Sequence, residues 1–313
     1  MSAPSSMESS RNSHAETTTR TLLVTGASSE LGSSLIRRLS GSPGWDIRAM
    51  VHRSLVNVPG CEMRPGNLSD VGLLARAASG VDTVIHLAAL TNSPREAEYF
   101  ETNVTGTRNL IDACVQGGVR RIIFISSRTA SVDGGSYARS KLEAEEIVKA
   151  SGLRWVILRP AEVYGTGSGG SVNRLAAWVQ RYPMIPVIGD GGSRLGPVYI
   201  DDVVSAMAQV VLDEKLENET IVLSGPDELT FDELVDRMAG FFGVRRFKLH
   251  LPVGLVKLAA TILSGLGIHV LVPDQIPRLL GEKPHGIEQA RKKLNYSPRK
   301  LEDGLNELFQ SGQ

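Results

Sequence analysis

The stretch TLLVTGASSELG, residues 21–32, decides the fold of this 313-residue chain. Its first half is a mostly apolar run that ends at Gly26, which is typical of a buried parallel strand. Apolar residues then recur at helical spacing over 31–39, until Pro43 stops the helix. A strand, a glycine turn and a helix therefore follow one another directly.

The same alternation of strand and helix continues to residue 165. Apolar runs that predict further strands occupy 46–53, 81–89, 119–127 and 153–160. Helical patterns between them occupy 70–79, 95–117 and 137–151. Parallel strands need connections of about a dozen residues, which these helices supply. We therefore expect an α/β fold with a Rossmann-type doubly wound parallel sheet.

The alternation breaks down after that stretch, where a loop rich in Gly and Ser leads into helices and short strands. We expect a disordered tail over 1–19 and a dinucleotide-binding domain over 20–165. Strands from about 186–224 should be interleaved with that domain. The smaller, mainly helical substrate-binding domain should comprise 166–185 and 225–313.

Composition excludes several classes of protein. Lys and Arg together number 34, as do Asp and Glu, so the chain lacks the basic excess of a sequence-independent nucleic-acid binder. The two cysteines, Cys61 and Cys114, suit a reducing compartment. Residues 1–20 lack the apolar run of a secretory signal, so we expect a cytoplasmic protein.

One apolar segment, 251–272, has about the length of a membrane span. It contains Pro252, Lys257 and His269 together with several glycines. This composition favours a packed helix or helix pair over a bound ligand, rather than a contact with a membrane surface. We expect no transmembrane segment.

The glycine turn at 26–32 points to a bound pyrophosphate. Gly26 lets the backbone turn tightly at the strand end, and Gly32 lets the helix pack close to the sheet. The N-terminus of the helix then offers free N–H groups and a partial positive charge to phosphate. Ser29 stands where dinucleotide sites often carry a middle glycine, and its hydroxyl could donate to a phosphate.

The end of the second strand bears on the choice of dinucleotide. NAD sites usually carry an Asp or Glu there, bonded to the ribose hydroxyl. This strand ends instead with His52 and Arg53, and Arg53 could pair with a 2′-phosphate. The sequence therefore allows NAD or NADP and favours NADP. Asn67 and Leu68, after the next short strand, could contact the edge of the adenine.

A hydroxyl and a lysine occur at the spacing of one helical turn. Tyr137 and Lys141 share a helix face, so the ammonium can lie near the phenol and lower its pKa. That would make Tyr137 a proton donor and acceptor near neutral pH. Ser126 and Ser127 end a strand at the sheet edge where open α/β folds bind ligands. Ser127 could hold a substrate oxygen next to the tyrosine.

These pieces together resemble the extended branch of the short-chain dehydrogenase/reductase superfamily, the NAD-dependent epimerase/dehydratase family of sugar-nucleotide epimerase type. The matching segments are TGASSELG (25–32), HLAA (86–89), NVTGTRNLIDAC (103–114), ISS (125–127), YARSK (137–141), LRPAEVYG (158–165), VYIDDV (198–203) and IEQARKKLNYSPRKLEDGL (287–305). The sequence departs from the family in having Ser29 in the loop, a gap of ten residues between Ser127 and Tyr137, and no Asn near Ala161 and Glu162.

The resemblance implies roles for the matching positions. Ser127 would orient the substrate oxygen, Tyr137 would be the acid/base, and Lys141 would bind the nicotinamide ribose. Asn103 would fix the backbone near the site. The cofactor would also contact Gly26, Ser28, Ser29, Glu30, Leu31, Gly32, His52, Arg53, Asn67, Leu68, Leu87, Ala88, Ala89, Asn103, Tyr137, Lys141 and Pro160. The substrate would contact Thr91, Ser127, Thr129 and Arg194.

A nucleotide-sugar also needs cations for its diphosphate. Arg174, Arg194 and Arg278 are the candidates in the C-terminal half, and Arg194 is the best placed of them. The family resemblance further implies that a homodimer would pair the helices 95–117 and 137–151. The six histidines and two cysteines show no metal-ligand spacing, and neither a GxSxG elbow nor a P-loop lysine occurs.

The sequence thus favours an NAD(P)-dependent oxidoreductase or epimerase acting on a carbohydrate, foremost a nucleotide-sugar. Two alternatives stay open. An NADPH-dependent reductase of a non-sugar ketone would suit Arg53 and the apolar segment 251–272. A dinucleotide-binding sensor or scaffold would do no chemistry, although such proteins tend to lose the tyrosine that this chain keeps.

Overall fold

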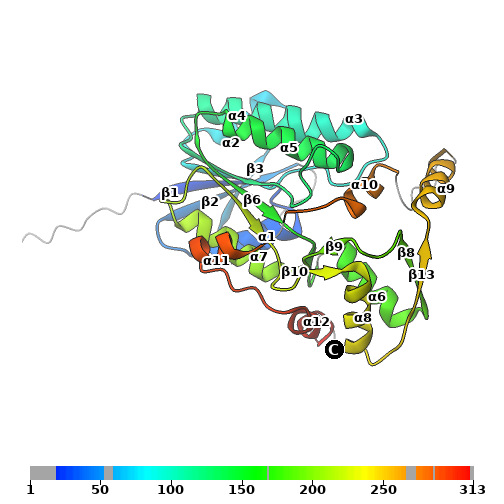
Figure 1. The fold of residues 1–313 in the computed structure, drawn as a ribbon. Helices are drawn as coiled ribbons and strands as arrows, with labels where there is room; N and C mark the ends of the chain where they lie inside the picture. Colours follow the sequence, from blue (N-terminus) through cyan, green and yellow to red (C-terminus); the bar gives the residue numbers. More distant parts are fainter. Residues whose placement is uncertain (1–18, 53–58, 168, 266–272, 285, 311–313) are drawn as a thin grey trace, which may run out of the picture.

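The computed structural model describes residues 19–52, 59–167, 169–265, 273–284 and 286–310. Its centre is a seven-stranded sheet in the order β11-β6-β5-β4-β1-β2-β3, and every strand pair in it is parallel (Figure 1). The strands are β1 (Arg20–Thr25), β2 (Trp45–Val51), β3 (Cys61–Pro65), β4 (Thr83–His86), β5 (Arg121–Ile125), β6 (Arg154–Pro160) and β11 (Glu219–Leu223).

Helices cover both faces of this sheet (Figure 1). One layer contains α2 (Val71–Ala78), α4 (Gly106–Gln116) and α5 (Gly135–Lys149). The opposite layer contains α1 (Glu30–Leu39), α7 (Ile200–Leu212) and α11 (Glu288–Leu294). The predicted doubly wound α/β fold is confirmed, because parallel strands alternate with helices on both faces.

The strand order reverses direction at β1, which lies between β2 and β4. Chain connections leave the carboxyl ends of β1 and β4 toward opposite faces, so a crevice opens between them. Gly26 follows β1 and Leu87 follows β4, which places the predicted dinucleotide loop at this crevice.

The strands predicted between 186 and 224 have different partners. Strand β11 joins the central sheet beside β6, whereas the strands before it pair elsewhere. The small pairings are β10 (Val198–Tyr199) with β7 (Val163–Tyr164), β9 (Arg194–Leu195) with β12 (Leu229–Thr230), and β8 (Met184–Ile188) with β13 (Phe247–Leu251). The division of the chain into a cofactor domain and a substrate domain stays a prediction.

The remaining elements are short and mostly helical. They are α3 (Glu96–Tyr99), the π-helical turn η1 (Phe100–Thr105), α6 (Ser171–Arg181), α8 (Phe231–Phe241), α9 (Val253–Gly265), α10 (Gln275–Leu280) and α12 (Leu301–Gln310). One hydrophobic cluster runs from the sheet into this part of the chain, since it contains both Val24 of β1 and Leu234 of α8.

The apolar segment 251–272 differs from the prediction of a packed helix. Its described part is α9, whose residues Leu255, Leu258 and Ile262 are exposed. The helix follows the β8–β13 ribbon at a distance from the central sheet (Figure 1). Residues 266–272 lie outside the described part. In the described ranges, no helix is long and apolar enough to cross a membrane.

Candidate active site

The turn after β1 can be built only with glycine at two positions. Gly26 has φ +66°, a region that other residues adopt at a cost, and a Cβ there would lie 2.7 Å from the Ala88 nitrogen. A Cβ on Gly32 would clash with the carbonyl oxygen of Gly26. The two glycines thus bring the start of α1 against the ends of β1 and β4, and the free N–H groups of its first turn lie at the crevice.

Ser29 has a structural role in the turn, and its contact with a phosphate stays a prediction. It is the N-cap of α1, and its hydroxyl oxygen accepts a hydrogen bond from the Gly32 N–H at 3.1 Å. The same hydroxyl donates to the Gly26 carbonyl oxygen at 2.7 Å. The Ser29 hydroxyl therefore shapes the loop by bonding at both ends of the turn.

A cavity of about 380 Å³ extends from this turn along the carboxyl ends of β1, β2 and β4. A volume in this range is ordinary for a ligand pocket. Its lining includes nine of the predicted cofactor residues, namely Gly26, Ser28, Ser29, His52, Asn67, Leu68, Leu87, Ala88 and Ala89. Met50, Gly66, Leu90 and Thr102 also line it and were missed by the sequence reasoning.

Other predicted cofactor residues lie beside the cavity or away from it. Glu30, Leu31, Gly32, Asn103, Tyr137, Lys141 and Pro160 are not among its lining residues. Arg53, which the sequence offers for a 2′-phosphate, lies outside the described residues. His52, immediately before it, does line the cavity, and no Asp or Glu is among the described lining residues. Small residues and a helix N-terminus at this cavity fit a dinucleotide.

His86 at the end of β4 is a buried neutral histidine that the sequence reasoning did not single out. Its ring nitrogens contact the hydroxyls of Thr25 at 2.6 Å and Thr107 at 3.1 Å. Burial, helped by the positive charge of Lys141, lowers the pKa of His86 to about 3. This histidine therefore ties β1, β4 and α4 together without carrying charge.

Asn103 fixes the backbone on the far side of the cavity. Its side-chain amide accepts from the Leu90 N–H at 2.7 Å and donates to the Leu90 carbonyl at 3.0 Å. It also donates to the Ser140 hydroxyl at 3.0 Å. Asn103 lies in the π-helical turn η1, a feature that often marks functional sites. It links the cavity wall to α5, the helix that carries Tyr137 and Lys141.

The predicted hydroxyl groups meet at the carboxyl end of β5. Tyr137 is half-buried in the first turn of α5 and lies close enough to Ser127 for that side chain to act on the pKa of the phenol. The hydroxyls of Ser127 and Thr129 lie 2.9 Å apart. Three hydroxyl groups therefore converge where a substrate oxygen could be held. Thr91, also predicted to contact substrate, accepts a hydrogen bond from Arg278 through its backbone carbonyl oxygen.

Lys141 is buried beneath this group rather than directed at the phenol. Its ammonium donates to the Ile125 carbonyl oxygen at 2.8 Å and lies 4.1 Å from the centre of the Phe124 ring. Burial lowers its pKa to about 7, although the carboxylate of Glu145 opposes that shift. Lys141 therefore changes charge near neutral pH.

The pKa of Tyr137 differs from the expectation that Lys141 lowers it. Burial raises this pKa, while the positive charge of Arg278 and the hydrogen bond with Ser127 act in the lowering direction. The guanidinium carbon of Arg278 lies 4.8 Å from the centre of the Tyr137 ring. The reason for the difference is the direction of Lys141, whose ammonium is bound to the end of β5.

Arg278 belongs to α10, a short helix that lies against the start of α5 (Figure 1). Its guanidinium donates to the Thr91 carbonyl oxygen at 3.3 Å. Just before it, the Asp274 carboxylate accepts from the Ser136 N–H at 2.6 Å, and the Gln275 amide donates to Asn92 at 2.6 Å. The segment around α10 is thus attached both to the start of α5, next to Tyr137, and to the loop after β4.

A buried group of charges lies behind the hydroxyls. Arg128, next to Ser127, is almost fully buried and contacts Glu162 at 2.8 Å and Glu228 at 3.3 Å. Lys283 approaches Glu162 at 3.8 Å. Arg194, predicted to bind substrate, is exposed on β9 and contributes only its carbonyl oxygen to this group. Glu162, near which the Asn common in the family is replaced, contacts both Arg128 and Lys283.

The sequence matches the model of a known protein family. That family is described as "NAD dependent epimerase/dehydratase family", and the match covers residues 22–224, which include the glycine turn, Ser127, Tyr137 and Lys141. The chain belongs to this family. It is an enzyme of the extended short-chain dehydrogenase/reductase type, and the predictions of family and of NAD or NADP as cofactor are confirmed.

The relatives of this family member act on chemically different substrates. A 2-alkyl-3-oxoalkanoate reductase from Stenotrophomonas maltophilia is 28% identical over 92% of this chain and 98% of its own length. A 3beta-hydroxysteroid-dehydrogenase/decarboxylase from Arabidopsis thaliana is 26% identical over 78% of this chain, which spans only 51% of that protein. Among solved structures, MoeE5 in complex with UDP-glucose and NAD is 25% identical, with a TM-score of 0.72 over 92% of this chain and 97% of its own.

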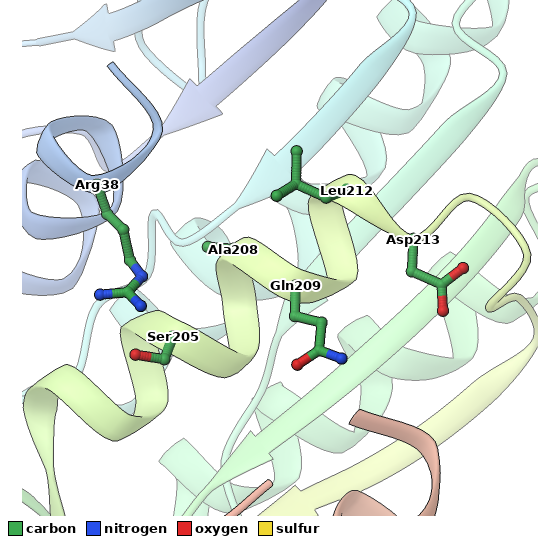
Figure 2. A pocket seen from close by; sticks show the side chains of 6 residues that line it. All are labelled: Arg38, Ser205, Ala208, Gln209, Leu212 and Asp213. Carbon is green, nitrogen blue, oxygen red and sulfur yellow. The ribbon is translucent and has the colours of Figure 1, made fainter. Parts of the chain in front are cut away.

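A second hollow, of about 440 Å³, lies far from these residues between α1 and α7 (Figure 2). Arg38 in the last turn of α1 and Asp213 after α7 contribute its charged groups. It is open to solvent and contains none of the predicted site residues. Although this hollow is larger than the cavity at the glycine turn, it holds none of the residues expected to bind the cofactor or the substrate.

Proposed function

We propose that this enzyme transfers hydride between a secondary carbinol or ketone carbon and NAD or NADP. The observation that carries the proposal is the grouping of Ser127, Thr129 and Tyr137 hydroxyls at the carboxyl end of β5. This grouping lies next to the cavity at the glycine turn, because Asn103 bonds both to Leu90 in the cavity wall and to α5.

In the oxidation direction, the substrate hydroxyl would lie between the Ser127 and Tyr137 oxygens. Tyr137 in its phenolate form would accept the O–H proton while the carbinol carbon loses hydride, and a ketone results. Reduction reverses both transfers, with Tyr137 returning the proton to the carbonyl oxygen. Ser127 would orient the substrate oxygen throughout. The bound dinucleotide supplies the hydride acceptor or donor.

Lys141 would assist the same hydride transfer from its buried position on α5. Its ammonium lies one helical turn from Tyr137 and has a pKa of about 7, so it can hold or release a proton at neutral pH. We propose that it binds the nicotinamide ribose of the cofactor. The glycine turn would hold the pyrophosphate, and Ala88 and Ala89 would allow its close approach.

The preferred dinucleotide is NADP in this proposal. Sequence places Arg53 directly after His52, where an NAD enzyme would usually carry a carboxylate for the ribose hydroxyl. An arginine fork at that point suits a 2′-phosphate.

The first candidate substrate is a nucleotide-activated sugar. MoeE5, which is 25% identical over nearly its whole length, was solved with UDP-glucose and NAD. In an epimerase the keto sugar would take the hydride back on its other face, so the cofactor would be regenerated in every cycle.

The second candidate is the net reduction of a non-sugar ketone. The 2-alkyl-3-oxoalkanoate reductase supports it, with 28% identity over 98% of its length. Stoichiometric consumption of NADPH would identify the reductase, whereas turnover without net consumption would identify the epimerase.

The test of the shared chemistry is Tyr137→Phe, which removes one oxygen and keeps the ring. We expect turnover of every accepted substrate to fall by at least about a thousandfold, because the proton acceptor is lost. Cofactor affinity, measured by fluorescence titration with NADPH, should change little. Turnover at the wild-type rate would contradict the proposed function.

A further inference from the structure

Arg278 is a cation beside the reacting hydroxyls with no carboxylate partner in the described part of the chain. Its guanidinium contacts the Tyr137 ring at 4.8 Å and the Thr91 carbonyl oxygen at 3.3 Å, a long hydrogen bond. The side chain is half-buried. Because a guanidinium has five donors and keeps its charge, this one has most of its donors free for another partner.

The neighbouring cations are already neutralised. Arg128 contacts both Glu162 and Glu228, and Lys283 approaches Glu162. Burial lowers the pKa of Lys283, and the nearby charge of Arg278 acts in the same direction. Of these cations near the hydroxyl group, Arg278 is therefore the one that an incoming anion would meet without displacing a protein carboxylate.

Arg278 is also held in place before any substrate arrives. Asp274 binds the Ser136 N–H, and Gln275 binds Asn92, so the chain on its N-terminal side is attached to α5 and to the loop after β4. The close approach of Asp274 needs glycine at 135, where φ is +85° and a Cβ would clash with the carbonyl oxygen and the side chain of Asp274. A cation held in this way binds an anion with a smaller loss of conformational freedom.

We infer that Arg278 binds a carboxylate that the substrate carries close to its reacting carbinol or carbonyl carbon. The inference rests on the proposed function and names its substrate class: hydroxy and oxo acids, whether or not a nucleotide is attached. The carboxylate exchanges its water shell for the guanidinium fork and takes no part in bond changes. The substrate would be held at two places, with its reacting oxygen at Tyr137 and Ser127 and its carboxylate at Arg278. These two contacts together would position the carbinol or carbonyl carbon.

The binding test uses pairs of compounds that differ in the carboxylate. These are 3-hydroxyoctanoate with its methyl ester, and UDP-glucuronate with UDP-glucose. Binding is measured by calorimetry in the Tyr137→Phe background with NADP⁺ present, so no turnover is needed. We expect the acid of at least one pair to bind about tenfold or more tightly than its neutral partner. Arg278→Gln should abolish that preference, and Arg278→Lys should keep part of it.

Arg245→Gln is the matched control, because Arg245 is exposed in the turn before β13, outside the site. It should leave the preference unchanged, and thermal melting reports whether each variant is folded. Equal binding within both pairs, no binding of either acid, or a preference that survives in folded Arg278→Gln would overturn the inference.

Turnover of the same four compounds by the wild-type enzyme separates this inference from the proposed function. Oxidation of the neutral compounds without preference for the acids would contradict the inference and support the hydride transfer. Arg278-dependent binding of an acid that is neither oxidised nor epimerised, with NAD⁺ or NADP⁺, would support the inference and contradict the hydride transfer.

Discussion

At the scale of single residues, the site depends on a lysine ammonium that the fold keeps almost fully buried. Lys141 contacts the Ile125 carbonyl and the Phe124 ring, and these contacts only partly replace its lost hydration. The folded state therefore holds Lys141 with a pKa of about 7, well below the 10.5 of an ordinary lysine. A group of this kind serves the chemistry at a cost in stability.

Lys141→Met should stabilise the protein at pH 7 by roughly 1–3 kcal/mol while abolishing activity. In the wild type, the folded protein loses the Lys141 proton near pH 7, whereas the unfolded chain keeps it to about 10.5. Stability linked to this group therefore rises with pH between those values. The variant should lack this rise. Urea unfolding at several pH values measures it, and parallel curves for both proteins would contradict the prediction.

At the scale of elements, the unit formed by β1, the glycine turn and α1 is specified locally. Ser29 caps the helix and closes the turn, while Gly26 and Gly32 permit backbone contacts that no larger residue allows. The sequence predicted this unit because each feature lies within twelve residues.

Gly32→Ala should destabilise the protein by about 1–3 kcal/mol and weaken NADP binding more than tenfold, because a methyl group would push α1 away from Gly26. Gly240→Ala is the matched control. Gly240 lies in α8, where a Cβ would meet no atom within 4 Å. Gly240→Ala should raise the free energy of unfolding by about 0.5–1 kcal/mol, because alanine has the higher helix propensity. If both substitutions changed the melting temperature by a similar amount, the predicted clash between a side chain at position 32 and Gly26 would be refuted.

Helix α5 is joined to β6 by a buried ion pair that the sequence reasoning missed. The Glu145 carboxylate receives two hydrogen bonds from the Arg159 guanidinium, at 2.8 and 2.6 Å. The signal was present, since Tyr137, Lys141 and Glu145 follow one another at four-residue spacing on one helix face. The partner strand could not be inferred from that spacing.

Glu145→Gln should lower stability by roughly 2–4 kcal/mol, because Arg159 would lose its partner at a buried site. It should also lower the pKa of Lys141 further, since the Glu145 carboxylate raises it. Glu146→Gln on the same helix breaks only an exposed pair with Lys149 and should change stability by less than about 0.5 kcal/mol. Chemical denaturation measures the free energy of unfolding of both variants. Equal losses in the two would contradict a stabilising role of the buried pair between Glu145 and Arg159.

At the scale of the whole molecule, the parallel sheet and its cofactor crevice were predictable and the C-terminal contacts were not. Alternating strands and helices show in local periodicity, but the pairing of β8 with β13 joins residues about sixty positions apart. Arg278 was one of three candidate arginines, and its place over Tyr137 depends on how 273–281 folds back onto α5. The direction of Lys141 depends on the end of β5, which spacing alone does not specify.

Cofactor binding should stabilise the whole enzyme by mass action. At a concentration one hundred times its Kd, a dinucleotide adds about 2.7 kcal/mol to the free energy of unfolding. We expect NADP⁺ to raise the melting temperature more than NAD⁺ at equal concentration, and Arg53→Ala to remove the difference. Thermal melting with each dinucleotide measures this. A larger shift with NAD⁺ would contradict the preference for NADP.

The place of β11 limits how this enzyme can be cut or assembled. Six strands of the central sheet come from the first 160 residues, but the seventh comes from Glu219–Leu223, after the chain has left the sheet and returned. A fragment ending near 165 would leave the hydrogen-bonding edge of β6 open to other chains. During synthesis on the ribosome, the edge of β6 stays unpaired until nearly sixty more residues have been made. Chaperones should therefore be needed most in this interval, to cover the open edge.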